Sequence, residues 1–263
     1  MSPAPEQSTP SWPRLAAVGL AGGLFAGVFG VGGGLIMVPL LLWWAKLDQR
    51  SAHATSLLAI TPIAVVGAVS YAVGGVFAWL PAIFVAIGGI VGAQVGAWLL
   101  RKMSVGILRW GFIAFIIASG VMLLVQLPDR SAVLDITVTT AAILLGLGLA
   151  MGISAGLFGI GGGVIVIPVL MLFFGQSDLV AKSISLLAMA PGAISGSISH
   201  IRHKSATLRD GAWVAAGSLI TTPLGAVIAF LLSPRLAALL FGLLMFVIAA
   251  NLIVRAWRQR GTN

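Results

Sequence analysis

Two glycine clusters contain the backbone groups of this chain that are best suited to bind a ligand. Each cluster combines four glycines with a proline five residues further on: Gly30, Gly32, Gly33, Gly34 and Pro39, then Gly159, Gly161, Gly162, Gly163 and Pro168. Glycine destabilises a helix by about 1 kcal/mol relative to alanine, and proline removes a backbone donor. We therefore expect each cluster to break a helix and to leave free amides at the start of the next helical segment. Such amides bind anions without a basic side chain; the alternative is that the glycines only allow two helices to cross closely.

Small polar side chains follow each cluster at matching positions. Thr55, Ser56 and Ser70 follow the first cluster, and Ser185 and Ser199 follow the second. Ser56 and Ser70 fall on one stripe of a helix, as do Ser185 and Ser199. We expect these side chains to bind the ligand or to line its pathway. The alternative for each serine is a hydrogen bond to the backbone of its own helix.

His53 and Lys182 occupy equivalent positions at the start of the two polar segments. Each could concentrate an anion at a vestibule of a transport pathway. The alternative is that both side chains extend to the lipid headgroups.

The two clusters belong to a duplicated segment. Residues 19–41 recur 129 positions later as residues 148–170, with fourteen of the 23 pairs identical. The chain is thereby divided into a polar tail, two homologous membrane repeats and a basic tail, at residues 1–13, 14–127, 128–256 and 257–263. Duplicated halves built around broken helices are a recurrent plan of transporters, which bind substrate near the middle of the membrane.

The composition predicts an all-α integral membrane protein. The chain is 59% hydrophobic and 8% charged, with a mean hydropathy of +1.11, which a soluble domain of this length does not show. Its net charge of +9 comes from basic residues in short loops, so it favours contact with lipid headgroups over nucleic acid. We predict about eight membrane-spanning elements, at residues 14–44, 52–74, 79–100, 107–127, 134–174, 183–201, 211–232 and 236–256.

The first element of each repeat is too long for one straight crossing. Residues 14–44 would form a helix of about 46 Å, against a hydrocarbon core of roughly 30 Å, and residues 134–174 are longer still. Each therefore either crosses obliquely or enters and returns, which leaves open whether the repeats are parallel or inverted. With eight simple crossings the basic residues divide almost equally between the two sides, so the positive-inside rule does not give the orientation.

Several classes of protein are excluded or disfavoured. None of the six acidic residues lies deep in a predicted span, whereas cation pathways and proton relays use buried carboxylates. The chain has no cysteine and shows neither a nucleophile–base–acid constellation nor a metal-binding cluster. We expect a protein that is not an enzyme and that needs no cofactor or metal.

The segments GVFGVGGGLIMVP and GLFGIGGGVIVIP, followed by HATSL and KSISL, make the chain similar to the TauE/SafE family of sulfite and organosulfonate exporters. The resemblance covers nearly the whole chain and implies a bacterial inner-membrane permease of about eight spans. It also implies a role for both glycine–proline motifs and for Thr55–Ser56. The second copy departs from that pair, since Ile184 stands at the position equivalent to Thr55.

These observations predict a transporter, in a bacterial inner membrane, of small sulfur-containing anions such as sulfite or a short organosulfonate. Export is the expected direction, because each negative charge leaving a cell with a negative interior gains about 2.3 kcal/mol per 100 mV. One alternative is an importer of the same solutes coupled to protons or sodium. Another is a membrane assembly or accessory protein that transports nothing. The expected partners are the anionic substrate and the lipid bilayer, and the sequence does not give an oligomeric state.

Overall fold

The protein is a bundle of α-helices, and its described residues contain no β-strand. The computed structural model describes residues 11–102, 105–125, 136–158, 162–202 and 207–260. The ten helices are α1 (Trp12–Phe29), α2 (Gly34–Trp43), α3 (Gln49–Val73), α4 (Trp79–Lys102), α5 (Val105–Val125), α6 (Val138–Phe158), α7 (Gly163–Phe173), α8 (Asp178–Arg202), α9 (Leu208–Leu231) and α10 (Pro234–Arg260).

The described residues form ten helices in place of the eight predicted elements, because each long first element is divided at its glycines. The predicted element at 14–44 becomes α1 and α2, and the one at 134–174 becomes α6 and α7. Within the described residues, six helices are long and apolar enough to cross a membrane: α1, α3, α6, α8, α9 and α10. Length and composition thus agree with a multi-pass membrane protein.

The helices α1 and α2 form a hairpin instead of one oblique crossing. A side chain added at Gly22 of α1 would collide with Met37 of α2, and Leu15 of α1 belongs to the same buried cluster as Leu41 and Ala45. The start of α1 is therefore next to the end of α2. The chain enters the bundle along α1, turns at the glycines and returns along α2, which is the re-entrant arrangement.

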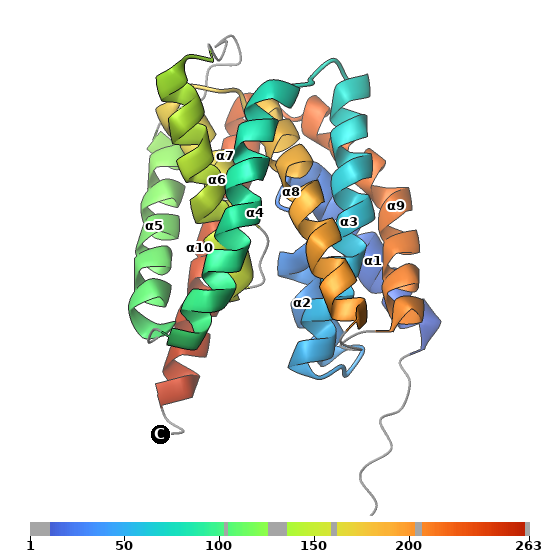
Figure 1. Cartoon of the computed structure of the whole chain (residues 1–263). Helices are drawn as coiled ribbons and strands as arrows, with labels where there is room; N and C mark the ends of the chain where they lie inside the picture. Colours follow the sequence, from blue (N-terminus) through green and yellow to red (C-terminus); the bar gives the residue numbers. More distant parts are fainter. Residues whose placement is uncertain (1–10, 103–104, 126–135, 159–161, 203–206, 261–263) are drawn as a thin grey trace, which may run out of the picture.

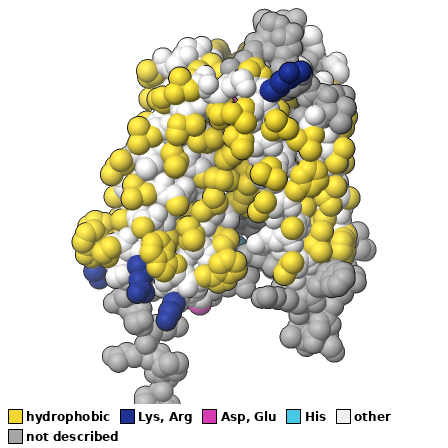
Figure 2. All heavy atoms as spheres, turned by 180° about the vertical axis from the view of Figure 1, so that it is seen from behind, with side chains coloured by type: hydrophobic (Ala, Val, Ile, Leu, Met, Phe, Trp, Pro, Cys, Tyr) yellow, Lys and Arg dark blue, Asp and Glu magenta, His cyan; other side chains and the backbone are white. Residues whose placement is uncertain are grey.

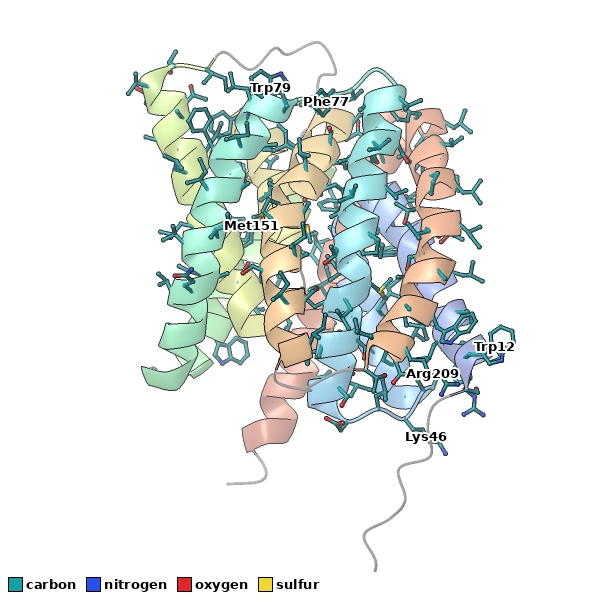
Figure 3. The ribbon with its side chains drawn as sticks, turned by 45° about the vertical axis from the view of Figure 1, so that its right-hand side comes forward. Trp12, Lys46, Phe77, Trp79, Met151 and Arg209 are labelled. Atoms are coloured by element: carbon teal, nitrogen blue, oxygen red, sulfur yellow. The ribbon has the colours of Figure 1, made fainter. Side chains whose placement is uncertain are left out.

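The helices α6 and α7 turn back in the same way. A side chain at Gly162, just before α7, would collide with Met151 of α6, and a side chain at Gly33, just before α2, would meet the carbonyl oxygen of Gly22. The two contacts are equivalent in the duplicated sequence, because Gly162 follows Gly33 by 129 residues and Met151 follows Gly22 by the same number. Figure 3 shows Met151 near mid-height of the bundle.

The remaining helices run through the whole bundle in alternating directions (Figure 1). Helices α3 and α8 are antiparallel, since the Thr61 hydroxyl contacts that of Ser197 while the Ser183 hydroxyl reaches the carbonyl of Val76. The chain begins α1 and ends α10 at the same end of the bundle, and α6 begins at the opposite end. The first five helices and the last five therefore run in opposite directions.

Glycines allow each hairpin to pack against the half of the chain to which it does not belong. A side chain at Gly217 of α9 would collide with the carbonyl of Ala16 in α1, and one at Gly88 of α4 would collide with the carbonyl of Leu145 in α6. The backbones are in direct contact at these points, as in closely packed membrane helices. The first hairpin is consequently packed on α9 and the second on α4, so neither is a separate unit.

Basic residues gather at the end of the bundle where α1 begins and α10 ends, here called the basic end. The helix directions place eleven described basic residues there: Arg14, Lys46, Arg50, Arg101, Lys102, Arg109, Arg202, Arg209, Arg255, Arg258 and Arg260. Lys182 and Arg235 belong to helices that begin at the opposite end. The near-equal division expected from eight simple crossings is therefore wrong, because the hairpins reverse the side on which every later loop lies.

The outer surface is mostly hydrophobic between the two ends. Figure 2 shows hydrophobic side chains over most of one face, with Lys and Arg side chains near its upper and lower edges. Figure 3 shows Phe77 and Trp79 at one end and Trp12, Lys46 and Arg209 at the other. Aromatic and basic side chains at both ends of an apolar belt are typical of a membrane-spanning protein.

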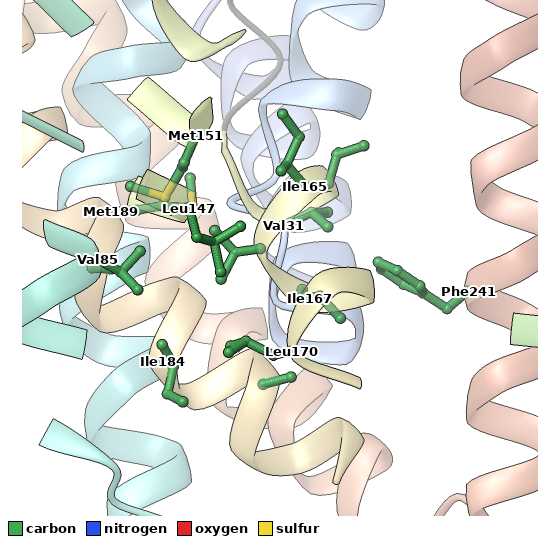
Figure 4. Close-up of a cluster of buried hydrophobic side chains, with 14 of the residues drawn as sticks. Val31, Val85, Leu147, Met151, Ile165, Ile167, Leu170, Ile184, Met189 and Phe241 are labelled. Atoms are coloured by element: carbon green, nitrogen blue, oxygen red, sulfur yellow. The ribbon is translucent and has the colours of Figure 1, made fainter. Parts of the chain in front are cut away.

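The largest buried cluster surrounds α7. Val31 of the first glycine cluster lies among Ile165 and Ile167 of α7, with Ile184 and Met189 of α8 beside them (Figure 4). A residue from the tip of one hairpin is thus part of the core built around the other hairpin.

Candidate functional site

The first glycine cluster forms a sharp turn that other residues would not adopt easily. Gly30, Gly32 and Gly33 have φ angles of 70°, 84° and 69°, which lie in the left-handed region that favours glycine. Gly30 ends α1 by donating its amide to the carbonyl of Ala26. The prediction that the helix breaks at this cluster is confirmed.

The turn leaves backbone donors inside the protein. The amide of Gly34 donates to the carbonyl of Gly32, and those of Ile36 and Met37 donate to that of Gly33. Within the described part of the chain, no acceptor is recorded for the amides of Gly32 and Gly33, and both residues are buried. Buried amides without an acceptor are uncommon, and here they precede the positive end of the α2 dipole.

The tips of the two hairpins touch each other. Ser185 of α8 donates its hydroxyl to the carbonyl oxygen of Gly30 at 2.9 Å. A side chain at Gly163, the first residue of α7, would collide with Ser185 Oγ, with Gly30 O and with Cα of Val31. The N-terminus of α7 therefore lies against the turn between α1 and α2.

This meeting point is close to the middle of the long helices α3 and α8. A side chain at Gly32 would collide with Met189, and Ile60 is also within 4 Å of that position. Ile60 and Met189 are each the twelfth residue of a 25-residue helix. If α3 and α8 cross the membrane, the two helix breaks lie near its middle.

Ser56 has a buried hydroxyl without a hydrogen-bond partner. Its side chain is 1% exposed, and within the described residues Ser56 Oγ is the buried side-chain oxygen for which the structure gives no partner. Ile60, one turn further along α3, is the residue near Gly32. An unpaired buried hydroxyl costs about 1–3 kcal/mol, and its position one turn from the helix break makes Ser56 a candidate for contact with a ligand.

Lys182 does not extend to the headgroups. Its side chain is 2% exposed and its Nζ lies 3.1 Å from Oδ2 of Asp178, one turn earlier in α8. The stem of Lys182 packs against Gly30, where an added side chain would collide with Lys182 Cβ and Cγ. The snorkelling alternative is wrong for this residue: its cation is buried beside Asp178, and its stem lies beside the first helix break.

Other expected site residues are distributed more widely. Thr55 is buried beside Ser56, and Pro168 is buried within α7. Ser70 donates to the carbonyl of Val66 in its own helix and lies ten residues, about 15 Å along the helix, from Ile60. Gly159, Gly161 and the side chain of Ser199 are outside the described residues.

His53 lies at a cavity of about 450 Å³ that is lined mainly by α2 and α10 and extends to the start of α2. Gly34 and Pro39 also line it, and Asn251 is a polar residue on its α10 side, while most of the wall is hydrophobic. The side chain of His53 is half-buried. His53 and Lys182 therefore occupy different environments, although the repeat predicted the same role for both.

Comparison with known proteins identifies the family. The model of the sulfite exporter TauE/SafE family matches residues 1–123 and 144–263. The chain belongs to the TauE/SafE family. This is a family of membrane transporters, and the resemblance seen in the sequence is confirmed.

Similar proteins occur in several microorganisms and are described as probable membrane transporters. A probable membrane transporter protein of Xylella fastidiosa is 26% identical over 250 residues, which cover 89% of this chain and 92% of the relative. The probable membrane transporter protein YunE of Bacillus subtilis is 25% identical over 71% of this chain and 77% of its own. A relative from Methanocaldococcus jannaschii is 26% identical over 72% of each chain. None of the names of these relatives gives a substrate.

The sequence interpretation of this TauE/SafE protein missed two groups. Asp178 was assigned to a loop because the span was predicted to begin at residue 183, whereas α8 begins at Asp178 and buries it. The spacing of Asp178 and Lys182, one turn apart, was the signal that could have revealed the pair. Tyr71 was also missed: it is buried, donates to the carbonyl of Gly27 at 2.8 Å, and is close enough to Asp178 for the two groups to interact electrostatically.

Proposed function

We propose that this protein transports small sulfur-containing anions, such as sulfite or a short organosulfonate, across a bacterial inner membrane. The observation that carries the proposal is the contact between the two helix breaks, at Gly30 and Gly163, near the middle of α3 and α8. The N-termini of α2 and α7 begin at this point, and their dipoles favour a negative ligand there. The description of the family as sulfite exporters supports the proposed substrate class.

We further propose that the two halves are inverted repeats with the substrate between them. The opposite directions of the two halves and the contacts that recur at a spacing of 129 residues support this proposal. Inverted repeats let a transporter expose one central site to either side by moving one set of elements against the other.

The basic end is proposed to face the cytoplasm. Eleven of the thirteen described basic residues lie there, and cytoplasmic loops carry an excess of Lys and Arg. In this orientation the start of α1 and the end of α10 face the cytoplasm, the α1–α2 hairpin enters from the cytoplasm and the α6–α7 hairpin enters from outside.

Export is the proposed direction, because the negative interior of a cell favours the exit of an anion. Import coupled to protons is a second candidate, which the buried carboxylate of Asp178 favours, since proton-coupled carriers use carboxylates inside the membrane. The dependence of transport on membrane potential and on a pH gradient separates the two directions.

Substrate counterflow in liposomes tests the proposal. Purified protein is reconstituted, loaded with unlabelled sulfite, sulfate, thiosulfate, taurine or sulfoacetate, and supplied with a trace of the labelled compound. We expect exchange above that of protein-free liposomes for at least one of the anions, and least exchange for taurine, whose ammonium group opposes the positive helix ends. Folded protein that exchanges none of them would contradict a transport function for these solutes and favour the accessory role.

A further inference from the structure

We propose that Asp178 is a built-in substitute for the transported anion, which holds Lys182 when the site is empty and is displaced from it by substrate. This inference rests on the proposed transport function and deepens it, because it names the residue that competes with substrate for the cation. The structural basis is a buried ion pair of 3.1 Å that adjoins the meeting point of the two helix breaks.

Lys182 is close enough to the helix breaks to pair either with Asp178 or with an anion bound between the breaks. Its stem covers Gly30, and Ser185, three residues later on the same helix face, donates to the carbonyl of Gly30. The same Ser185 hydroxyl borders Gly163 at the start of α7. Lysine carries its charge on a flexible four-carbon stem, so rotation of that stem moves the ammonium group from Asp178 toward the hairpin tips without movement of α8.

The surroundings of the pair favour this competition. Tyr71 of α3 is close enough to Asp178 for the two groups to interact electrostatically. Its hydroxyl, however, donates its hydrogen to the carbonyl of Gly27. Helix α7 contains no charged residue, and the charged residues of α4 and α9 lie at the basic end, away from the start of α8. Arg235 lies in the first turn of α10, at the end of the bundle where α8 begins, and its side chain is exposed. Among the described residues, Lys182 is the cation that the structure pairs with Asp178 inside the protein.

A buried cation without a counter-ion is strongly unfavourable. In the empty protein the carboxylate of Asp178 is the counter-ion that contacts the Lys182 ammonium group, at 3.1 Å. An anion that binds between the helix breaks offers Lys182 a second negative group, and the α8 N-terminus, where Asp178 is the first residue, supports the carboxylate that is left behind. No covalent bond changes in this step. The Lys182 ammonium group exchanges the carboxylate of Asp178 for the bound anion.

This role makes a prediction that a purely structural ion pair does not. If the pair only supports the fold, Asp178→Asn and Lys182→Gln weaken transport in the same direction. If Asp178 competes with substrate, Asp178→Asn removes the competitor and lowers the half-saturation concentration for the transported anion on the order of tenfold, whereas Lys182→Gln raises it. The double variant should resemble Lys182→Gln, because without the cation there is nothing to compete for.

The test combines counterflow with thermal unfolding in detergent, using the sulfur anion that the wild-type protein exchanges. Asp178→Asn should unfold at a lower temperature than the wild type without anion, and the anion should raise its unfolding temperature more than that of the wild type, because the anion replaces the missing carboxylate. If the single variant folds only when the anion is present, that dependence supports the proposal as well, and the double variant, which buries no unpaired charge, should fold without it.

Equal anion-induced shifts in the wild type and Asp178→Asn, with an unchanged or higher half-saturation concentration in the variant, would overturn the proposal. That result would leave the transport function intact, since the wild type would still exchange the anion. Absence of exchange and of any thermal shift in the wild type would overturn both.

Discussion

Ser185 of α8 donates a hydrogen bond of 2.9 Å to the carbonyl oxygen of Gly30, the last residue before the first helix break. The bond joins residues 155 positions apart in the chain and connects the second half of the protein to the tip of the hairpin formed by the first. Its equivalent in the first half, Ser56, has a buried and unpaired hydroxyl. Two residues at matching positions of a duplicated sequence thus differ: the Ser185 hydroxyl is bonded to the first hairpin, and the Ser56 hydroxyl has no partner among the described residues.

Ser185→Ala should destabilise the protein. The substitution leaves a buried carbonyl without this donor, at a cost of about 1–3 kcal/mol, and it should lower the unfolding temperature measured in detergent. Ser154→Ala is the matched control, since Ser154 is buried and donates within its own helix, to the carbonyl of Met151. An unfolding temperature reduced equally by both substitutions would argue against a special role for the bond between α8 and the hairpin.

Gly163→Ala should reduce transport at least tenfold while the protein still inserts in the membrane. The added methyl group would meet Ser185 Oγ and Gly30 O at 2.7 and 2.8 Å, and overpacking of this kind costs about 1–3 kcal/mol. It would push the two hairpin tips apart. Gly146→Ala in α6, where the added methyl has no neighbour within 4 Å, should exchange substrate at the wild-type rate. Wild-type exchange by Gly163→Ala would show that contact between the breaks is not required.

Much of this arrangement could be predicted from the sequence, but the path of the hairpins could not. The glycine clusters placed the helix breaks correctly, since α2 begins at Gly34 and α7 at Gly163. Glycine and proline show where a helix stops, but the direction of the chain after a break depends on contacts such as Gly22 with Met37. A break followed by a straight continuation and one followed by a return have the same local sequence.

The candidate site could be predicted only in part for a related reason. Ser56 and Ser185 were expected at a binding site from their spacing alone, but only tertiary contacts distinguish the free hydroxyl from the bonded one. Lys182 was expected near the membrane surface because the start of α8 was placed at residue 183. The polar sequence GQSD before it resembles a loop, whereas the structure buries Gln176, Ser177 and Asp178.

The proposed orientation can be tested with single cysteines, since the chain contains none. Phe77 and Arg209 are both exposed and lie at opposite ends of the bundle (Figure 3). In intact cells a membrane-impermeant thiol reagent should label Phe77→Cys and should label Arg209→Cys only after the inner membrane is permeabilised. The reverse pattern would place the basic end outside the cell.

The contact between Thr61 and Ser197 offers a test of motion between α3 and α8. Their hydroxyl oxygens are 3.1 Å apart, so the double variant Thr61→Cys/Ser197→Cys should form a disulfide under mild oxidation. If the halves move against each other during transport, oxidation should stop counterflow and a reductant should restore it. Either single-cysteine variant serves as the control, and counterflow that continues in the fully cross-linked protein would contradict relative movement at this point.

The most direct test of the central claim, that the anion binds where the two helix breaks meet, is the thermal shift produced by the transported anion in Ser56→Ala. Because Ser56 Oγ has no partner in the described structure, its removal should leave the unfolding temperature of the empty protein unchanged or slightly higher. Binding at a hundredfold excess over the dissociation constant stabilises a protein by about 2.7 kcal/mol, so the anion should raise the unfolding temperature of the wild type clearly. The same shift should appear in Ser218→Ala, a buried serine that donates within its own helix, and should be largely lost in Ser56→Ala. A full shift in Ser56→Ala, with the half-saturation concentration of the wild type in counterflow, would contradict a site at the helix breaks.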